Sequence, residues 1–268
     1  MNETTRPVFV LCPGSQKSGT TWLRTYLDSF DFSDFGPFGE GHIWEVRSGA
    51  ETKRRVGPRK LLSLRRDVWL RFAMQNFDGF YERYFAGRIR GNVRMTGDVT
   101  PAYATLDAAT FAEIRKRLEG KGFAVKVVFL MRDPVSRCVS AAEMQRRKAG
   151  DGSMFAHDQL RKRYASNFFQ ARTRYDLIIE RLETVFGSGN VHYGFFESMF
   201  TAEALTELSG FLQIPAKTDF LDRKINAARG AQTQIDPALL AEIRSFYQPV
   251  YEYCFDRFPH TRELWAKR

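Results

Sequence analysis

The stretch VFVLCPGSQKSGTTW, residues 8–22, decides the fold. Its first five residues form an apolar run bounded by prolines, which is typical of a buried parallel strand. A glycine-bearing turn follows. From Thr20 onward, apolar side chains recur at helical spacing as far as Phe30. The stretch therefore predicts the opening strand, turn and helix of a βαβ unit.

The turn between this strand and helix has the features of a phosphate site. Gly14 and Gly19 permit tight turns, and the backbone N–H groups of residues 18–21 open the helix and point at an anion. Lys17 adds a positive charge, and two threonines add hydroxyl donors. The P-loop of nucleotide triphosphatases ends in Gly-Lys-Ser/Thr, whereas here the lysine precedes the last glycine. We expect phosphate binding; an ordinary glycine-rich turn is the alternative.

A second strand-to-helix junction predicts a second anion site. Residues 126–131 form another apolar run, and Asp133-Pro134 is typical of a helix start. Arg132 leaves the strand at its carboxyl end, and Ser140 lies about two turns into the helix. The guanidinium and the hydroxyl can converge on one phosphate. The alternative is a capped helix with Arg132 in a structural ion pair.

Strands and helices alternate along the rest of the chain. We expect further strands at 191–196 and 93–95, and helices at about 64–86, 107–119, 168–186, 200–213 and 237–255. This alternation predicts a single α/β domain over residues 1–268, with a central parallel β-sheet flanked by helices on both faces and a P-loop NTPase-like fold. Ligands of such sheets bind at the carboxyl ends of the strands, where both junctions lie.

Composition limits the class of protein. The 268 residues are 43% hydrophobic and carry a net charge of +10, which suits a sizeable core and a surface that attracts anions. Three scattered cysteines, Cys12, Cys138 and Cys254, have neither disulfide nor zinc spacing. The N-terminal apolar run is too short for a signal peptide or a membrane span. We expect a cytoplasmic protein without stable membrane insertion.

Together, the two junctions resemble the paired motifs of the sulfotransferase family. One is similar to the family's loop for the 5′-phosphosulfate of 3′-phosphoadenosine-5′-phosphosulfate (PAPS), and the other to its strand–helix pair for the 3′-phosphate. The resemblance covers about residues 8–258 and includes a late basic-glycine loop. It implies that ten residues bind the donor: Lys17, Ser18, Gly19, Thr20, Thr21, Trp22, Arg132, Ser140, Arg229 and Gly230.

The motifs are most similar to the heparan-sulfate-type and bacterial branch. Residues 39–44 resemble its Lys-Glu-x-His-Phe-Phe stretch, which implies Glu40 as the general base. His42 is the alternative, because a histidine is the base in the steroid- and phenol-type branch. Residues 97–103 resemble the branch's Glu-Lys-Thr/Ser-Pro-x-Tyr segment, with Asp98 where the family often has lysine. An aspartate there would repel an anionic acceptor, or bind a cationic or hydroxylated one.

The resemblance implies sulfuryl transfer from PAPS to a hydroxyl or amine, with release of adenosine 3′,5′-bisphosphate (PAP). Such transfer is in line, so catalysis depends on positioning and electrostatics. Lys17 would neutralise the leaving phosphate oxygen. Because Lys17, Arg132 and Arg229 would meet the donor's phosphates, no metal is required. The acceptor can be a small molecule, a saccharide or a lipid, and the oligomeric state stays open.

Two other classes of protein fit part of the sequence. A P-loop kinase or nucleotide triphosphatase needs an acidic magnesium ligand at the end of a strand, where Arg132 stands. A nucleic-acid-binding protein would suit the charge, but the basic run of residues 47–71 lacks interleaved exposed aromatics. We interpret that run as a mobile loop leading into a helix. It either forms the rim of a site for an acidic acceptor or is simply solvated.

Overall fold

The computed structural model describes residues 6–37, 39–63, 65–149, 156–223 and 235–266. Arg229 and Gly230, the predicted late loop of the donor site, lie outside these ranges.

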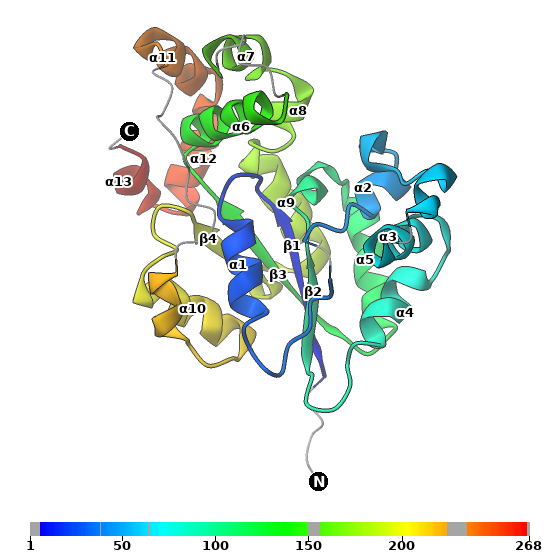
Figure 1. Ribbon diagram of the computed structural model, residues 1–268. Helices are drawn as coiled ribbons and strands as arrows, with labels where there is room; N and C mark the ends of the chain where they lie inside the picture. The colour runs from blue at the N-terminus through cyan, green and yellow to red at the C-terminus, as the bar shows by residue number, and fades with distance from the viewer. Residues whose placement is uncertain (1–5, 38, 64, 150–155, 224–234, 267–268) are drawn as a thin grey trace.

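Four parallel strands form the centre of the molecule (Figure 1). They are β1 (Val8–Gly14), β2 (Met95–Val99), β3 (Ala124–Met131) and β4 (Val191–Phe195), in the spatial order β2-β1-β3-β4. This confirms the predicted α/β fold with a central parallel sheet. The predicted strand at 93–95 was misplaced, because the buried segment Met95–Val99 pairs with β1 from Val8 to Cys12.

Alternate residues of the strands face opposite layers of helices. Phe9 and Leu11 pack into one apolar cluster with α5 (Ala108–Glu119) and α9 (Tyr175–Phe186). Val10 and Cys12 pack into a second cluster with α1 (Thr20–Leu27) and α10 (Ala202–Leu212). Since strand side chains alternate between the two faces of a sheet, both faces of β1 are covered and the strand is apolar throughout.

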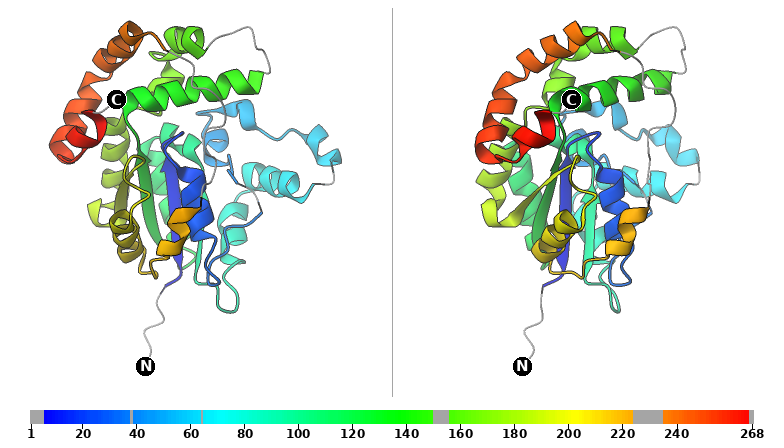
Figure 2. Two further views of the ribbon diagram at one scale, coloured as in Figure 1. Left: turned by 60° about the vertical axis from the view of Figure 1, so that its left-hand side comes forward. Right: turned by 90° about the vertical axis from the view of Figure 1, so that its left-hand side faces the viewer.

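The remaining helices lie mainly toward the carboxyl ends of the strands (Figures 1 and 2). One group follows β3 and β4 and comprises α6 (Pro134–Ala149), α7 (Ala156–Arg163), α8 (Asn167–Gln170), α11 (Pro237–Phe246), α12 (Gln248–Arg257) and α13 (Thr261–Ala266). A second group precedes β2 and comprises α2 (Trp44–Arg47), α3 (Arg66–Asn76) and α4 (Phe80–Ala86). Within the described ranges, five short 3₁₀ turns complete the elements: η1 (Thr52–Arg54), η2 (Pro58–Leu62), η3 (Pro101–Thr105), η4 (Ser188–Asn190) and η5 (Thr218–Asp222).

Several predicted helices are broken where the chain has a local reason to turn. The helix predicted at 64–86 is α3 and α4, separated at Gly79, whose φ of 72° suits glycine. The helix predicted at 237–255 is α11 and α12, with Pro249 in the first turn of α12. The helix predicted at 168–186 is α8 and α9. Helices were confirmed in the predicted segments, but the prediction of single unbroken helices was wrong.

The sheet order places a ligand site between β1 and β3. After β1 the chain builds β2 on one side, and it then returns to build β3 on the other side. Connections leaving the carboxyl ends of β1 and β3 therefore diverge, which is where open α/β sheets bind ligands. Over the part of the chain that the structure describes, no helix is both long and apolar enough to cross a membrane.

Candidate functional site

The phosphate loop, residues 15–19, joins β1 to α1. The Ser15 N–H donates to the Leu130 carbonyl (2.6 Å), which anchors the loop to the neighbouring strand. The Ser15 and Ser18 hydroxyls lie 2.7 Å apart, and both are buried. Gly19 precedes α1 with a φ of 87°, and a Cβ there would collide with the thioether of Met199. The φ angle favours glycine at this position, which lets the chain turn tightly into α1.

The start of α1 offers free backbone donors. No side chain caps this helix, and its first internal bond joins the Leu23 N–H to the Gly19 carbonyl (3.1 Å). The N–H groups of residues 20–22 therefore have no helical partner. Such groups, with the helix dipole, attract anions. The Trp22 ring itself is buried and stacked on Tyr26, with 5.5 Å between ring centroids, so it also holds α1 in the core.

Arg132 connects the two predicted phosphate motifs. Its guanidinium Nη1 donates to the Lys17 carbonyl (3.2 Å) and lies over the Phe196 ring, 4.3 Å from the centroid. Tyr175 on α9 holds the Arg132 peptide, since its hydroxyl donates to the Arg132 carbonyl (2.9 Å). Motifs that are 115 residues apart in the sequence are therefore in direct contact.

The start of α6 is already satisfied by a side chain. Asp133 caps it by accepting from the Ser136 N–H (2.7 Å), and the Tyr251 hydroxyl donates to the other carboxylate oxygen (2.5 Å). The predicted helix start is confirmed. An anion beside β3 would thus depend on the Arg132 side chain rather than on the helix end. Ser140 is partly buried in α6, and the described contacts show no hydrogen bond to its hydroxyl.

Positive charges collect around Lys17. Burial lowers the pKa of Lys17, and the charges of Arg147, Arg132 and Lys148 lower it further. Arg147 and Lys148 lie exposed in the last turn of α6. Because like charges repel one another, a multiply charged anion would reduce the repulsion within this cluster. The donor set, cations and unpaired N–H groups, therefore fits a phosphate-bearing ligand.

Residues 40–43, here called the Glu40 loop, place an imidazole between two carboxylates. His42 Nε2 lies 2.9 Å from Glu40 Oε2, and His42 Nδ1 lies 2.5 Å from Glu45 Oε1. The Glu45 side chain is fully buried, whereas half of the Glu40 side-chain surface is exposed. The three groups form a line from the interior to the surface, which leaves Glu40 as the carboxylate that a ligand can reach.

The charges of this line affect the protonation of the two candidate bases. Burial alone would lower the pKa of His42, but the hydrogen bonds and charges of Glu40 and Glu45 outweigh it and raise that pKa to about 9. Burial alone would raise the pKa of Glu40, but the hydrogen bond and the charge of His42 outweigh it, so that pKa lies below its ordinary value. Burial raises the pKa of Glu45. At neutral pH, His42 is therefore positively charged, and it cannot accept a proton.

The Glu40 loop and the phosphate loop lie close enough for their charges to interact. The negative charge of Glu40 raises the pKa of Lys17, which opposes the effect of the surrounding cations. The charges of Lys148 and Arg54 in turn lower the pKa of Glu40. Four predicted residues, Lys17, Arg132, Glu40 and His42, are thus brought together.

The expectation for Asp98 was wrong. Asp98 is 4% exposed, and it accepts hydrogen bonds from Thr100 (2.6 Å), Tyr103 (2.7 Å) and Tyr81 (3.1 Å). A carboxylate enclosed by hydroxyl donors in the core neither repels nor binds an acceptor. Counting back from Thr100-Pro101, Asp98 stands at the glutamate of the resembled segment and Val99 at its lysine.

Three residues that surround the Glu40 loop were not predicted from the sequence. Glu45 follows His42 by three residues, a spacing that places both side chains on one side of a helical turn. Arg71 and Gln75 lie one turn apart on α3 and donate to carbonyls of the loop. The Glu45 spacing was visible in the sequence, but the contacts of α3 depend on tertiary structure.

The basic run of residues 47–71 is more ordered than a simple loop. It comprises the end of α2, then η1 and η2, and the start of α3. Val56 is buried within it, and its N–H donates to the Gln75 side chain (2.8 Å). Most of its cations are exposed: Lys53, Arg54, Arg55, Arg59, Lys60, Arg65 and Arg66. The helix that we expected after the run is α3.

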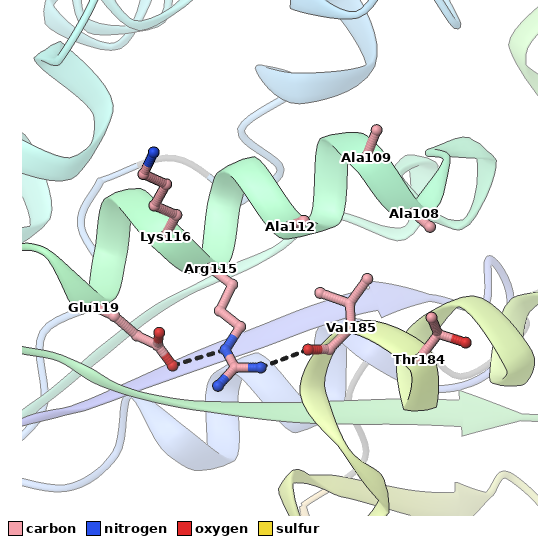
Figure 3. Close-up of a pocket in the computed structure, with 8 residues that line it drawn as sticks. All are labelled: Ala108, Ala109, Ala112, Arg115, Lys116, Glu119, Thr184 and Val185. Carbon is pink, nitrogen blue, oxygen red and sulfur yellow. Dashed lines mark hydrogen bonds and ion pairs between the residues drawn. The ribbon is translucent and has the colours of Figure 1, made fainter.

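A surface pocket of about 630 Å³ opens elsewhere, between α5 and α9 (Figure 3). Arg115 crosses it and donates to Glu119 (2.8 Å) and to the Val185 carbonyl (2.6 Å). None of the predicted site residues lines it. In the described ranges, no three His, Cys, Asp or Glu side chains are grouped as metal ligands.

Comparisons with known proteins bear on this site. Residues 8–242 match the family model described as a sulfotransferase domain. The structure resembles a sulfotransferase from Alicyclobacillus acidocaldarius, with a TM-score of 0.59 and 19% identity over 92% of this chain and 93% of that chain. It also resembles the sulfotransferase domain of the Synechococcus PCC 7002 olefin synthase, with a TM-score of 0.51 and 19% identity over 91% and 90%. At this identity, the two structures show a shared fold. No curated protein matches the sequence.

Proposed function

This chain belongs to the sulfotransferase domain family, and we propose that it transfers a sulfuryl group from PAPS to a hydroxyl or amine of an acceptor, releasing PAP. One observation carries the proposal. The Arg132 guanidinium donates to the Lys17 carbonyl (3.2 Å), so two anion-binding motifs adjoin at the carboxyl ends of β1 and β3. A donor with phosphates at both ends of one adenosine matches such a pair.

The donor would be held mainly by the phosphate loop and by Arg132. The N–H groups that open α1 suit the 5′-phosphosulfate, together with the Lys17 ammonium and the Ser18 hydroxyl. Arg132 and Ser140 suit the 3′-phosphate. The loop with Arg229 and Gly230, outside the described ranges, is proposed to complete that end. Because these cations would neutralise the phosphates, no divalent ion is required.

Glu40 is proposed to accept the proton of the acceptor. The acceptor oxygen forms a bond to sulfur while the bond from sulfur to the 5′-phosphate oxygen breaks, and the acceptor proton passes to Glu40. Because the pKa of Glu40 lies below its ordinary value, the proton moves only as positive charge builds on the attacking oxygen. His42, charged and bonded to Glu45, holds the Glu40 carboxylate in place. Lys17 neutralises the leaving oxygen.

The arrangement favours the heparan-sulfate-type and bacterial branch, in which a glutamate is the base. A histidine base, as in the steroid- and phenol-type branch, would first require His42 to lose its proton. Since the pKa of His42 is about 9, that loss is unfavourable at neutral pH.

The acceptor is proposed to be acidic and to be bound at the exposed cations near Glu40. Arg54 lies in η1 and Lys148 lies in α6, and the charges of both lower the pKa of Glu40. A small molecule, a saccharide or a lipid with an acidic group would fit this charge. Three buried free thiols suit a reducing compartment, so we propose that the enzyme is cytoplasmic. We also propose that it works as a single domain.

The test is transfer of labelled sulfur from PAPS to a panel of saccharide, lipid and phenolic acceptors, with and without acidic groups. We expect transfer by the native chain and little by the Lys17→Ala variant. A chain that binds neither PAPS nor PAP would contradict the proposal.

A further inference from the structure

The backbone of the Glu40 loop is held at four successive residues by side chains from elsewhere. Two of the contacts come from α3. Arg71 Nη2 donates to the Glu40 carbonyl (3.1 Å), and Gln75 Nε2 donates to the His42 carbonyl (2.6 Å). These donors are one helical turn apart, so a single face of α3 binds alternate carbonyls of the loop.

The other two contacts come from the segment that follows β2. The Gly41 N–H donates to the Thr100 hydroxyl (2.8 Å), and the Ile43 N–H donates to the Tyr103 hydroxyl (3.3 Å). Both hydroxyls belong to fully buried residues. The loop is therefore held through its N–H groups on one side and through its carbonyls on the other.

Asp98 sets the direction of the two hydroxyl groups. Thr100 gives its proton to Asp98 Oδ1 (2.6 Å), and Tyr103 gives its proton to Asp98 Oδ2 (2.7 Å). A hydroxyl has one proton, so these bonds turn its lone pairs toward the N–H groups of the loop. Burial raises the pKa of Asp98, and the hydrogen bonds from Thr100, Tyr103 and Tyr81 oppose that shift by favouring the charged form. In that form the carboxylate only accepts hydrogen bonds, so it can orient both hydroxyls at once.

Gly41 shows how closely the loop approaches this carboxylate. A Cβ on Gly41 would lie 3.1 Å from Asp98 Oδ2 and 3.3 Å from Asp98 Oδ1. Both distances are shorter than comfortable contact, and the carboxylate is held by its donors. A side chain at Gly41 would therefore force the loop or the Asp98 carboxylate to shift.

We propose that Asp98, with Thr100 and Tyr103, is a positioning site that fixes the Glu40 loop for proton transfer. The inference rests on the proposed role of Glu40. Its competitor is a purely structural role for the same buried network in the core.

Tyr81 supplies a matched control for that competitor. It is buried like Tyr103 and donates to the same oxygen, Asp98 Oδ2 (3.1 Å). In the described contacts, however, its hydroxyl accepts nothing from the Glu40 loop. Removing either hydroxyl takes one donor from Asp98, but only the loss of the Tyr103 hydroxyl releases a backbone group of the loop.

The experiment compares Tyr103→Phe with Tyr81→Phe, and Thr100→Val with Thr100→Ser. Misplacement of a reacting group by about 1 Å can cost about a hundredfold in rate. We expect Tyr103→Phe and Thr100→Val to lower kcat by roughly tenfold or more, with PAP affinity unchanged. Tyr81→Phe and Thr100→Ser should stay within about twofold of the native kcat. Thermal unfolding of the two phenylalanine variants should show similar losses of stability.

A readout independent of turnover separates this inference from the proposed function. The pKa of His42, measured by NMR titration of the imidazole, should fall from about 9 toward its ordinary value in Thr100→Val but not in Tyr81→Phe. An unchanged pKa of His42 in Thr100→Val would overturn the positioning role, whether or not the enzyme transfers a sulfuryl group. A shifted pKa of His42 with native kcat would overturn the role of this positioning in catalysis. Equal losses of kcat in Tyr103→Phe and Tyr81→Phe would support the structural role instead.

Discussion

The phosphate loop and the Glu40 loop are built in opposite ways. The phosphate loop owes its shape mainly to its own backbone, through positive φ angles at Lys17 and Gly19 and a bond from the Ser15 N–H to the Leu130 carbonyl. The Arg132 side chain adds one bond, to the Lys17 carbonyl. The Glu40 loop owes its shape to side chains of α3, of Thr100 just after β2, and of η3, which are about 30 to 60 residues further along the chain. The first loop presents backbone donors to an anion, and the second presents one carboxylate. Donor binding and proton transfer therefore depend on different contacts, so a substitution can impair one and leave the other.

The largest expected effect comes from Glu40→Gln. Removing a general base costs about 10²- to 10⁴-fold in rate. We expect kcat to fall within that range while PAP affinity changes far less, because in the described contacts the Glu40 carboxylate is bonded to His42 and affects Lys17 only through its charge. Single-turnover rates and PAP titration measure the two quantities. If PAP affinity fell along with kcat, the two loops would not be separate.

Arg132→Ala should have the complementary effect. Hydrogen bonds to charged groups contribute about 1.5–3 kcal/mol, so donor affinity should fall roughly 10- to 150-fold while kcat at saturating donor changes less. Ser140→Ala should lower donor affinity by about fivefold, which corresponds to the loss of one neutral hydrogen bond. Arg132→Lys serves as the control that keeps the charge and loses the planar fork. A lower kcat with native donor affinity would contradict the assignment of Arg132.

Neutralising Arg54, Arg55 and Arg59 together should raise the KM of an acidic acceptor by several-fold, because exposed charges attract weakly and are screened by salt. The increase should shrink at high ionic strength. The matched control neutralises three exposed cations that lie away from the carboxyl ends of the strands: Arg90, Lys116 and Lys121. An unchanged KM in the first variant would remove the basic segment from the acceptor site.

The pH profile should show the smallest change. Glu40, with its pKa below the ordinary value, is ionised throughout the neutral range, so kcat should be nearly flat from about pH 6 to 8. Above about pH 9, His42 loses its proton, and the rate should decline. If neutral His42 were the base, the rate would instead rise roughly tenfold per pH unit up to about 9.

The same group links pH to stability. Folding raises the pKa of His42 from 6.5 to about 9, so its contribution to the free energy of unfolding is complete below about pH 6.5. That contribution is lost as the pH rises through 9. Thermal unfolding of the native chain and of His42→Gln should converge at high pH.

The sequence predicted the phosphate loop because its signals are local. An apolar strand, two glycines and a helical spacing lie within residues 8–30, and each has a direct backbone consequence. The four-stranded parallel fold followed from the same kind of signal. β2 was misplaced because Gly97 and Asp98 are unusual in a buried strand, and only its pairing with β1 reveals it.

The supports of the Glu40 loop could not be predicted in the same way. Asp98 was expected to face an acceptor, since a sequence does not show whether a carboxylate is exposed or surrounded by hydroxyls in the core. Gln75 resembles any other residue of an amphipathic helix. Its three bonds, to His42, Arg54 and Val56, exist only because α3 packs against the loop.

The central claim is that Lys17 and Arg132 bind the two ends of one adenosine bisphosphate. Isothermal titration calorimetry of the native chain, of Lys17→Ala and of Arg132→Ala, with PAP and with ATP plus Mg²⁺, tests it most directly. We expect PAP to bind without a divalent ion and more tightly than ATP, and we expect each variant to bind PAP more weakly. Tighter binding of ATP with magnesium, or PAP affinity unaffected by both variants, would contradict it.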